Sequence, residues 1–239
     1  PFYGLAEVTV GGRSCVISQT GFSGESGYEI YLRNATLYAD DMWDAVLEAG
    51  KKHNLMVIAP AHHRRIQAGI LSWGQDLDHE HNPFQCNLGY QVSLSGKGEW
   101  AKKGDYIGKQ ALEKMKADLK DGHKPYKLQL VGFEIGGKPI DEYAPDFWLV
   151  SPGDGGDPCG FITSPWYHPE KGKNIAMGYI PFDGTLNPNG FPKWELGKKF
   201  KVHLPDIYAD EPGVPVDAVT VDVPFTESFN ANTREVVKG

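Results

Sequence analysis

Cysteine is scarce in this chain, which has Cys15, Cys86 and Cys159 among its 239 residues. An odd number of widely spaced cysteines, with no Cys-x-x-Cys pair, excludes a disulfide framework and a zinc site built on paired thiolates. We therefore expect a reducing compartment, the cytoplasm, and no bound metal ion.

Long apolar runs and an excess of positive charge are also missing. The longest apolar run, residues 55–61, is far shorter than the roughly 20 residues that a membrane-spanning helix needs. The chain has 24 Lys and Arg against 31 Asp and Glu, and its net charge is -7. An acidic surface disfavours binding to a nucleic acid or an anionic membrane, so we expect neither partner.

Glycine and proline are plentiful, at 29 and 17 residues, and they predict many turns and short strands. The first 122 residues mix strands and helices, which is typical of an α+β fold. Alternating or apolar patterns predict strands over residues 6–10, 14–19, 28–33, 55–58 and 88–94, and helices over 36–54, 60–71 and 105–119.

The pattern of predicted secondary structure changes after Gly122. Short strand-like runs follow at roughly ten-residue spacing, separated by Gly, Pro and Asp turns, with no strong helix between them. They cover residues 127–135, 147–150, 159–164, 176–180, 199–203 and 218–223. We expect two domains, 1–122 and 123–239, of which the second is an all-β barrel or sandwich.

Single motifs do not identify a function. The glycines at 21, 24 and 27 lie between two predicted strands and lack the Lys-Ser/Thr pair of a phosphate-binding loop. The acidic and histidine-rich segment 76–81 is interpreted as a polar surface loop, because adjacent loop residues rarely all face one metal ion. The basic residues 62–65 suit either a solvated surface or a contact to an anion. Glu29 lies within a strand of aromatic and branched residues, where alternation places it on the same face as Tyr31.

Residues 19–30, QTGFSGESGYEI, are similar to the TGYTGEDGxEI segment of the glycine-cleavage T-protein (aminomethyltransferase) superfamily of tetrahydrofolate-dependent one-carbon transferases. They are the first of five segments that resemble this family in order along the chain. Residues 74–78, GQDLD, resemble its YGNDID loop, and residues 106–112, YIGKQAL, resemble the start of one of its helices. The remaining similarities are residues 130–133, LVGF, and the pair 160–164 and 174–179, GFITS and NIAMGY.

The resemblance implies a partial folate-binding domain followed by a β-barrel, with tetrahydrofolate as cofactor. Glu29 falls on the family's glutamate that holds the pterin ring, whose adjacent N–H donors an ionised carboxylate can accept. Phe22 falls on a folate-contacting tyrosine, Tyr90 on a folate-contacting tryptophan, and Trp73 on a position near the folate where tyrosine is usual.

The resemblance also implies that the chain is the C-terminal portion of a longer enzyme. The family's catalytic aspartate belongs to an N-terminal half without counterpart here, so we expect no catalytic residue in the chain and that half as a partner. Ala61, Gln67 and Trp73 depart from the family pattern, which favours a demethylase that moves a methyl group from a small donor, such as a methoxylated aromatic, to folate N5. The alternatives are an aminomethyltransferase of the glycine cleavage system and a non-enzymatic folate-binding module.

Overall fold

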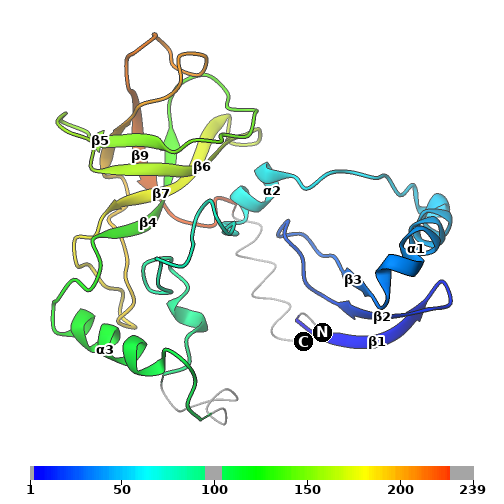
Figure 1. Ribbon diagram of the computed structural model, residues 1–239. Helices are drawn as coiled ribbons and strands as arrows, with labels where there is room; N and C mark the ends of the chain where they lie inside the picture. Colours follow the sequence, from blue (N-terminus) through cyan, green and yellow to red (C-terminus); the bar gives the residue numbers. More distant parts are fainter. Residues whose placement is uncertain (1–2, 95–103, 227–239) are drawn as a thin grey trace. The chain divides into compact units, whose positions relative to one another are not determined.

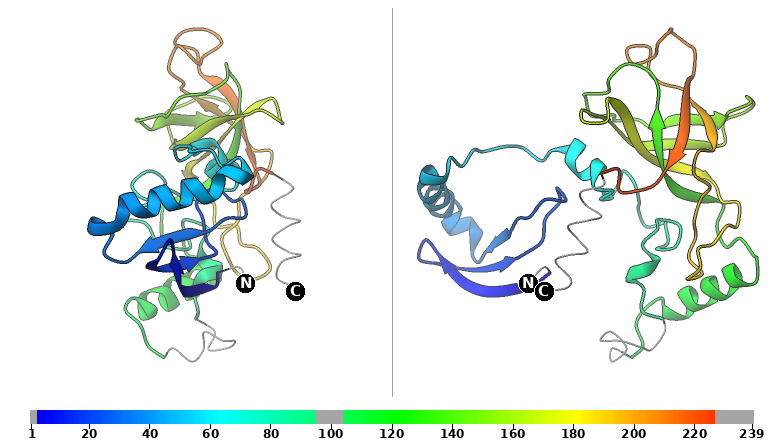
Figure 2. Two further views of the ribbon diagram at one scale, coloured as in Figure 1. Left: turned by 90° about the vertical axis from the view of Figure 1, so that its right-hand side faces the viewer. Right: turned by 180° about the vertical axis from the view of Figure 1, so that it is seen from behind.

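A computed structural model describes residues 3–94 and 104–226 of the chain (Figures 1 and 2). These residues form two compact units. The first contains the described residues up to Ile70 together with Thr226, and the second runs from Leu71 to Phe225.

The first unit is a three-stranded antiparallel sheet with a helix on one side (Figure 1). The strand order is β1-β2-β3, and a turn through Gly11 and Gly12, both with positive φ, joins the first two strands. Arg13 ties β2 to α1 through an ion pair with Asp41 at 2.5 Å. The elements are β1 (Leu5–Val10), β2 (Arg13–Ser18), β3 (Glu29–Leu32), α1 (Ala35–Gly50), the 3-10 turn η1 (Lys51–His53) and α2 (His62–Gln67).

The strand predicted over residues 55–58 is wrong. These residues have no regular structure, and their side chains are 48–77% exposed. An apolar run becomes a strand only where another strand pairs with it, and none of the described strands pairs with this one. The helix predicted from Pro60 begins instead at His62.

The second unit contains a closed six-stranded barrel in which every strand pair is antiparallel (Figure 2). The order around the barrel is β4-β7-β6-β5-β8-β9. Each strand corresponds to one of the six predicted runs, which confirms the α+β fold with a C-terminal barrel. The strands are β4 (Leu128–Ile135), β5 (Trp148–Pro152), β6 (Gly160–His168), β7 (Lys173–Pro181), β8 (Lys199–Val202) and β9 (Val216–Val221).

Alternating side chains fill the barrel. Val131, Phe133 and Val150 are completely buried, and the Phe133 ring meets Phe200 edge-on at 5.9 Å between centroids. Burial of this kind contributes about 1.5–3 kcal/mol for each large apolar side chain. The barrel therefore supplies a rigid frame on which the loops before it can be fixed.

A smaller apolar cluster lies beside the barrel in the same unit. It joins Phe84, Leu119 and Phe182, and it involves α3 (Lys109–Lys120). The strand predicted over residues 88–94 is wrong: the chain forms a 3-10 turn, η2 (Gly89–Gln91), at this place. A β-carbon on Gly89 would lie 2.8 Å from the Phe191 ring, so glycine permits the close approach of this turn to the cluster.

Two expected absences concern the described part of the chain. No helix there is both long enough and apolar enough to cross a membrane. The three cysteines form no disulfide, while the reducing compartment stays a prediction. The division at residue 122 also stays a prediction, because compactness of the two units does not test where a domain begins.

Candidate functional site

The four predicted folate contacts divide between the two units. Phe22 and Glu29 belong to the first unit, and Trp73 and Tyr90 belong to the second. The structure therefore describes two local sites, each within its own unit, and the proposed contacts to folate stay predictions.

Glu29 begins β3, and its carboxylate is oriented by two hydroxyl groups. Tyr31 donates to Glu29 Oε2 at 3.1 Å, and Thr20 donates to the same oxygen. The bond from Tyr31 confirms that alternation places residues 29 and 31 on one face. Ser18 lies 2.6 Å from Thr20 between their hydroxyl oxygens and pairs with Glu29 in the β2–β3 ladder.

This arrangement fixes the direction of the carboxylate. Both of these hydroxyl groups donate to Oε2 of the carboxylate. The side chain is partly buried, so a ligand can still reach it. A carboxylate held on one oxygen can present the other to a pair of adjacent N–H donors.

Phe22 lies above a buried arginine. Its ring is 48% exposed, and the Arg65 guanidinium carbon lies 5.9 Å from the ring centroid. Arg65 is fully buried and donates through Nη1 to the Ile70 carbonyl at 3.1 Å and through Nε to His62 Nδ1 at 3.3 Å. The interpretation of the basic segment as a solvated surface is therefore wrong for Arg65.

The glycine-rich loop and α2 are joined on the surface of the first unit. Arg64 forms an ion pair with Glu25 at 2.8 Å. Both side chains are about half exposed, and such pairs contribute at most about 1 kcal/mol. This ion pair and the cation–π contact between Arg65 and Phe22 bring the loop that precedes Glu29 against the helix. No local pattern in the sequence predicts this association.

In the second unit, Trp73 is exposed on a loop that is anchored to the barrel. Its ring is 61% exposed and meets His79 edge-on at 4.9 Å. The loop closes through a hydrogen bond from Gly74 N–H to the Leu77 carbonyl at 2.8 Å, with Gly74 at a φ of 81°. Trp73 is thus an exposed aromatic side chain on a defined turn.

The anchor of this loop is Asp76, which is 1% exposed. Its Oδ1 accepts hydrogen bonds from the Thr163 hydroxyl at 2.5 Å and the Ser164 hydroxyl at 2.6 Å, both on β6. Its Oδ2 accepts from Ser72 N–H at 2.8 Å. The interpretation of segment 76–81 as a surface loop is therefore wrong for Asp76, because barrel hydroxyls compensate for the burial of its carboxylate.

Tyr179 strengthens the same attachment from β7. Its hydroxyl donates to the Asp76 carbonyl at 2.6 Å and lies 3.4 Å from Cys86 Sγ. Burial raises the pKa of Tyr179 above its ordinary value, so the hydroxyl remains a neutral donor. Sequence reasoning missed this contact, although Asp76, the Thr163–Ser164 pair and Tyr179 all lie in segments that resemble the family.

No group of three or more His, Cys, Asp or Glu side chains suited to a metal ion occurs in the part of the chain that the structure describes. His81 instead contacts Asp78, with 2.7 Å between Nδ1 and Oδ1. The absence of a bound metal stays a prediction that metal analysis of the purified protein can test.

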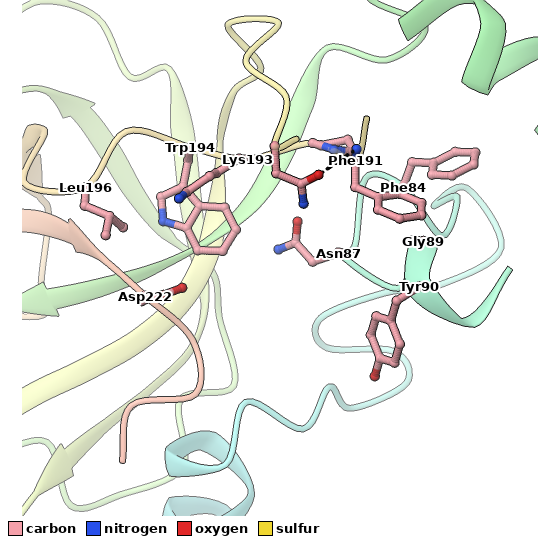
Figure 3. Close-up of a pocket in the computed structure, with 11 residues that line it drawn as sticks. Phe84, Asn87, Gly89, Tyr90, Phe191, Lys193, Trp194, Leu196 and Asp222 are labelled. Atoms are coloured by element: carbon pink, nitrogen blue, oxygen red, sulfur yellow. Dashed lines mark hydrogen bonds between the residues drawn. The ribbon is translucent and has the colours of Figure 1, made fainter. Parts of the chain in front are cut away.

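Tyr90 lies on η2 at the edge of a cavity of about 280 Å³ (Figure 3). Its ring is 73% exposed, and its hydroxyl accepts a hydrogen bond from Gln91 Nε2 at 3.0 Å. Phe84, Phe191 and Trp194 contribute further aromatic surface to the lining. This cavity lies entirely within the second unit.

A comparison with known families matches residues 1–96 to the GCVT N-terminal domain. The aminomethyltransferase of Caldanaerobacter subterraneus is 31% identical over 181 residues, which are 75% of this chain and 43% of that protein. The aminomethyltransferase of Symbiobacterium thermophilum is 33% identical over 186 residues, 76% of this chain and 44% of that protein. The chain thus spans less than half of the length of these relatives.

A solved structure supports the fold. The glycine cleavage system aminomethyltransferase T from Bartonella henselae matches 89% of this chain and 50% of its own, with a TM-score of 0.57. Its sequence is 20% identical, so the match establishes a similar fold alone.

Proposed function

Because the chain belongs to the glycine-cleavage T-protein (aminomethyltransferase) family, we propose that it binds tetrahydrofolate through Glu29 and serves in one-carbon transfer. The observation that carries this proposal is the orientation of the Glu29 carboxylate by Thr20 and Tyr31. A partly buried acceptor of fixed direction is suited to the adjacent N–H donors of a pterin.

The residues around Glu29 fit such a ligand. The exposed ring of Phe22 offers an apolar surface in the same unit, and the buried Arg65 guanidinium lies behind that ring. Each charge-assisted hydrogen bond to the carboxylate is worth about 1.5–3 kcal/mol. Tetrahydrofolate, when bound, supplies N5 as the atom that gives or receives the one-carbon unit.

The role of these residues is to bind and orient. Thr20 and Tyr31 hold the carboxylate, and the carboxylate holds the flat ring in one orientation. Fixing a reactant in a productive geometry lowers the barrier by removing rotational and translational freedom before the reaction. The group that moves the proton in this proposal lies in an N-terminal half that pairs with the chain.

The proposal of such a partner half is supported by the surface of the first unit. Tyr28, Trp43 and Met56 are exposed by 67%, 55% and 77%, so large apolar side chains are uncovered on the loop before β3, on α1 and on the loop that follows η1. Exposed apolar surface on this scale favours burial against another folded part. The comparisons support the same proposal, because the relatives are about twice as long as the matched region.

Aminomethyl transfer is the donor chemistry that the relatives support best, since they carry the name aminomethyltransferase. Demethylation of a small methyl donor remains the second candidate, and it is supported by Ala61, Gln67 and Trp73, which depart from the family pattern. A folate-binding module without activity is the third.

A product assay separates these candidates. A protein that includes the N-terminal half is incubated with tetrahydrofolate and either an aminomethyl-loaded lipoyl carrier or a methoxylated aromatic acid. Formation of 5,10-methylene-tetrahydrofolate supports aminomethyl transfer, and 5-methyl-tetrahydrofolate supports demethylation. Saturable folate binding without either product would leave only the binding module.

A further inference from the structure

The cavity beside Tyr90 has walls that are fixed before any ligand binds (Figure 3). The Phe84 and Phe191 rings stack with 6.4 Å between their centroids. The Trp194 indole N–H donates to the Val221 carbonyl at 3.0 Å, which holds that ring in place. A preformed aromatic wall binds a flat ring without the entropic cost of ordering side chains.

The two ends of the cavity differ in chemistry. In Figure 3, Phe84 and Tyr90 lie toward one end, whereas Lys193 and Asp222 lie toward the end at Trp194. One end therefore offers aromatic surface, and the other offers one cation and one anion.

The charged groups of the cavity are available to a ligand. Lys193 is exposed and has no ion pair among residues 3–94 and 104–226. Asp222 is exposed as well, and its Oδ1 accepts a hydrogen bond from the neighbouring Val223 N–H at 3.1 Å. A carboxylate and an N–H group on one ligand would complement these two side chains.

A third polar group has a fixed orientation. Asn187 Oδ1 accepts from Asn189 N–H at 2.9 Å and from Phe191 N–H at 3.1 Å. Because Oδ1 accepts both bonds from the loop 187–191, the Nδ2 donor of the same amide points away from that loop. Within the described part of the chain, that donor makes no hydrogen bond, so it can donate to a carboxylate of a ligand in the cavity that Asn187 lines.

From this arrangement we propose that the cavity binds an aromatic ring joined to an amino-acid unit, in which an N–H group and a carboxylate share one carbon. The ring lies against Phe191 and Tyr90, the carboxylate meets Lys193, and the N–H group donates to Asp222. The volume of about 280 Å³ is at the small end for ligand sites and suits a ligand of this size.

Two sources carry this chemistry. One is the benzoylglutamate end of a folate, and the other is a free aromatic amino acid. The proposal needs neither Glu29 nor the first unit, so it goes beyond the proposed function and can stand if that function fails.

The test uses the full chain and NMR titration of the Trp194 indole N–H, assigned with Trp194→Phe. The probes are 4-aminobenzoylglutamate, phenylalanine and the uncharged N-methylbenzamide. We expect saturable shifts with the first two probes, and binding about tenfold weaker in Lys193→Gln, because a charge-assisted contact is lost. N-methylbenzamide should bind Lys193→Gln and the wild type equally.

Matched variants control the result. Lys199→Gln removes an exposed lysine of the same barrel that does not line the cavity, and it should bind both probes as the wild type does. Asp222→Asn should weaken phenylalanine about tenfold, since its ammonium group loses an anionic partner. Absence of saturable shifts with both charged probes, or equal binding by Lys193→Gln and the wild type, would overturn the proposal.

Competition identifies the source and separates the proposal from the folate site. Displacement of phenylalanine by tetrahydrofolate in the wild type supports the benzoylglutamate end as the natural ligand. Simultaneous binding of both supports a free aromatic amino acid. If phenylalanine binds but tetrahydrofolate does not, the proposed function fails while the assignment of the cavity holds.

Discussion

Replacing Asp76 by alanine should destabilise the second unit strongly without changing its fold. The change removes an acceptor of hydrogen bonds from Ser72 N–H and from the hydroxyls of Thr163 and Ser164. The Thr163 hydroxyl can donate instead to the Met177 carbonyl, which lies 3.1 Å away. Losing the bond from Thr163 to Asp76 therefore costs little stability.

The magnitude follows from the other two donors. Each buried donor that loses its acceptor costs about 1–3 kcal/mol, and removing a buried carboxylate returns part of its desolvation cost. We expect Asp76→Ala to lower the free energy of unfolding by about 3 kcal/mol. The Trp73 loop should lose protection first, because Asp76 anchors it to β6.

Urea unfolding, followed by circular dichroism, measures the total decrease in the free energy of unfolding. Native-state hydrogen exchange of the amides of Gly74 and Asp76, which donate to carbonyls of the loop, locates it. Glu80→Ala is the matched control, since Glu80 is exposed on the same loop and should change stability by less than about 0.5 kcal/mol. Equal stability of Asp76→Ala and Glu80→Ala would refute the reasoning that a buried anchor holds this loop.

Two further predictions concern the second unit. Gly89→Ala should destabilise the protein by about 1–3 kcal/mol and weaken binding in the cavity, because the new methyl group would meet Phe191 at 2.8 Å and Phe84 at 2.9 Å. Thermal unfolding and the probe titration check this prediction, and an unchanged melting temperature would contradict it. Burial lowers the pKa of His168 below its ordinary value of 6.5, and Lys171 lowers it further. The unfolded chain therefore binds more protons below pH 6.5, so stability should be full above that pH and fall as the pH drops below it. In His168→Gln this part of the pH dependence should disappear, and an identical pH profile would show that other groups cause it.

The barrel could be predicted from sequence because its strands are short alternating runs bounded by turn residues. Every strand from β4 to β9 forms where such a run occurs. The segment 55–58 is apolar like the barrel strands, but it has no partner strand among the described residues. The conformation of residues 88–94 is determined by the packing of Gly89 against Phe84 and Phe191. Local patterns carry no information about such contacts between distant segments.

In the candidate site, too, local features could be predicted from the sequence, whereas contacts between distant segments could not. Alternation alone places Glu29 and Tyr31 on one face, and their hydrogen bond confirms it. The burial of Asp76 could not be predicted from its own loop, because the hydroxyls that satisfy it lie 87 and 88 residues further along the chain. The cation–π contact between Arg65 and Phe22 likewise joins residues that are distant in sequence.

The central claim is that Glu29 holds the pterin of tetrahydrofolate, and a calorimetric titration of the chain tests it most directly. Glu29→Gln removes the negative charge that strengthens both expected contacts to the pterin N–H donors, so the charge-assisted character of these hydrogen bonds is lost. Glu48→Gln is the control, because Glu48 is an exposed residue of α1 paired with Lys51. The account predicts saturable binding to the wild type and to Glu48→Gln, and affinity at least about tenfold lower in Glu29→Gln with the fold intact. Equal affinity of Glu29→Gln and the wild type, or no saturable binding to the wild-type chain, would contradict it.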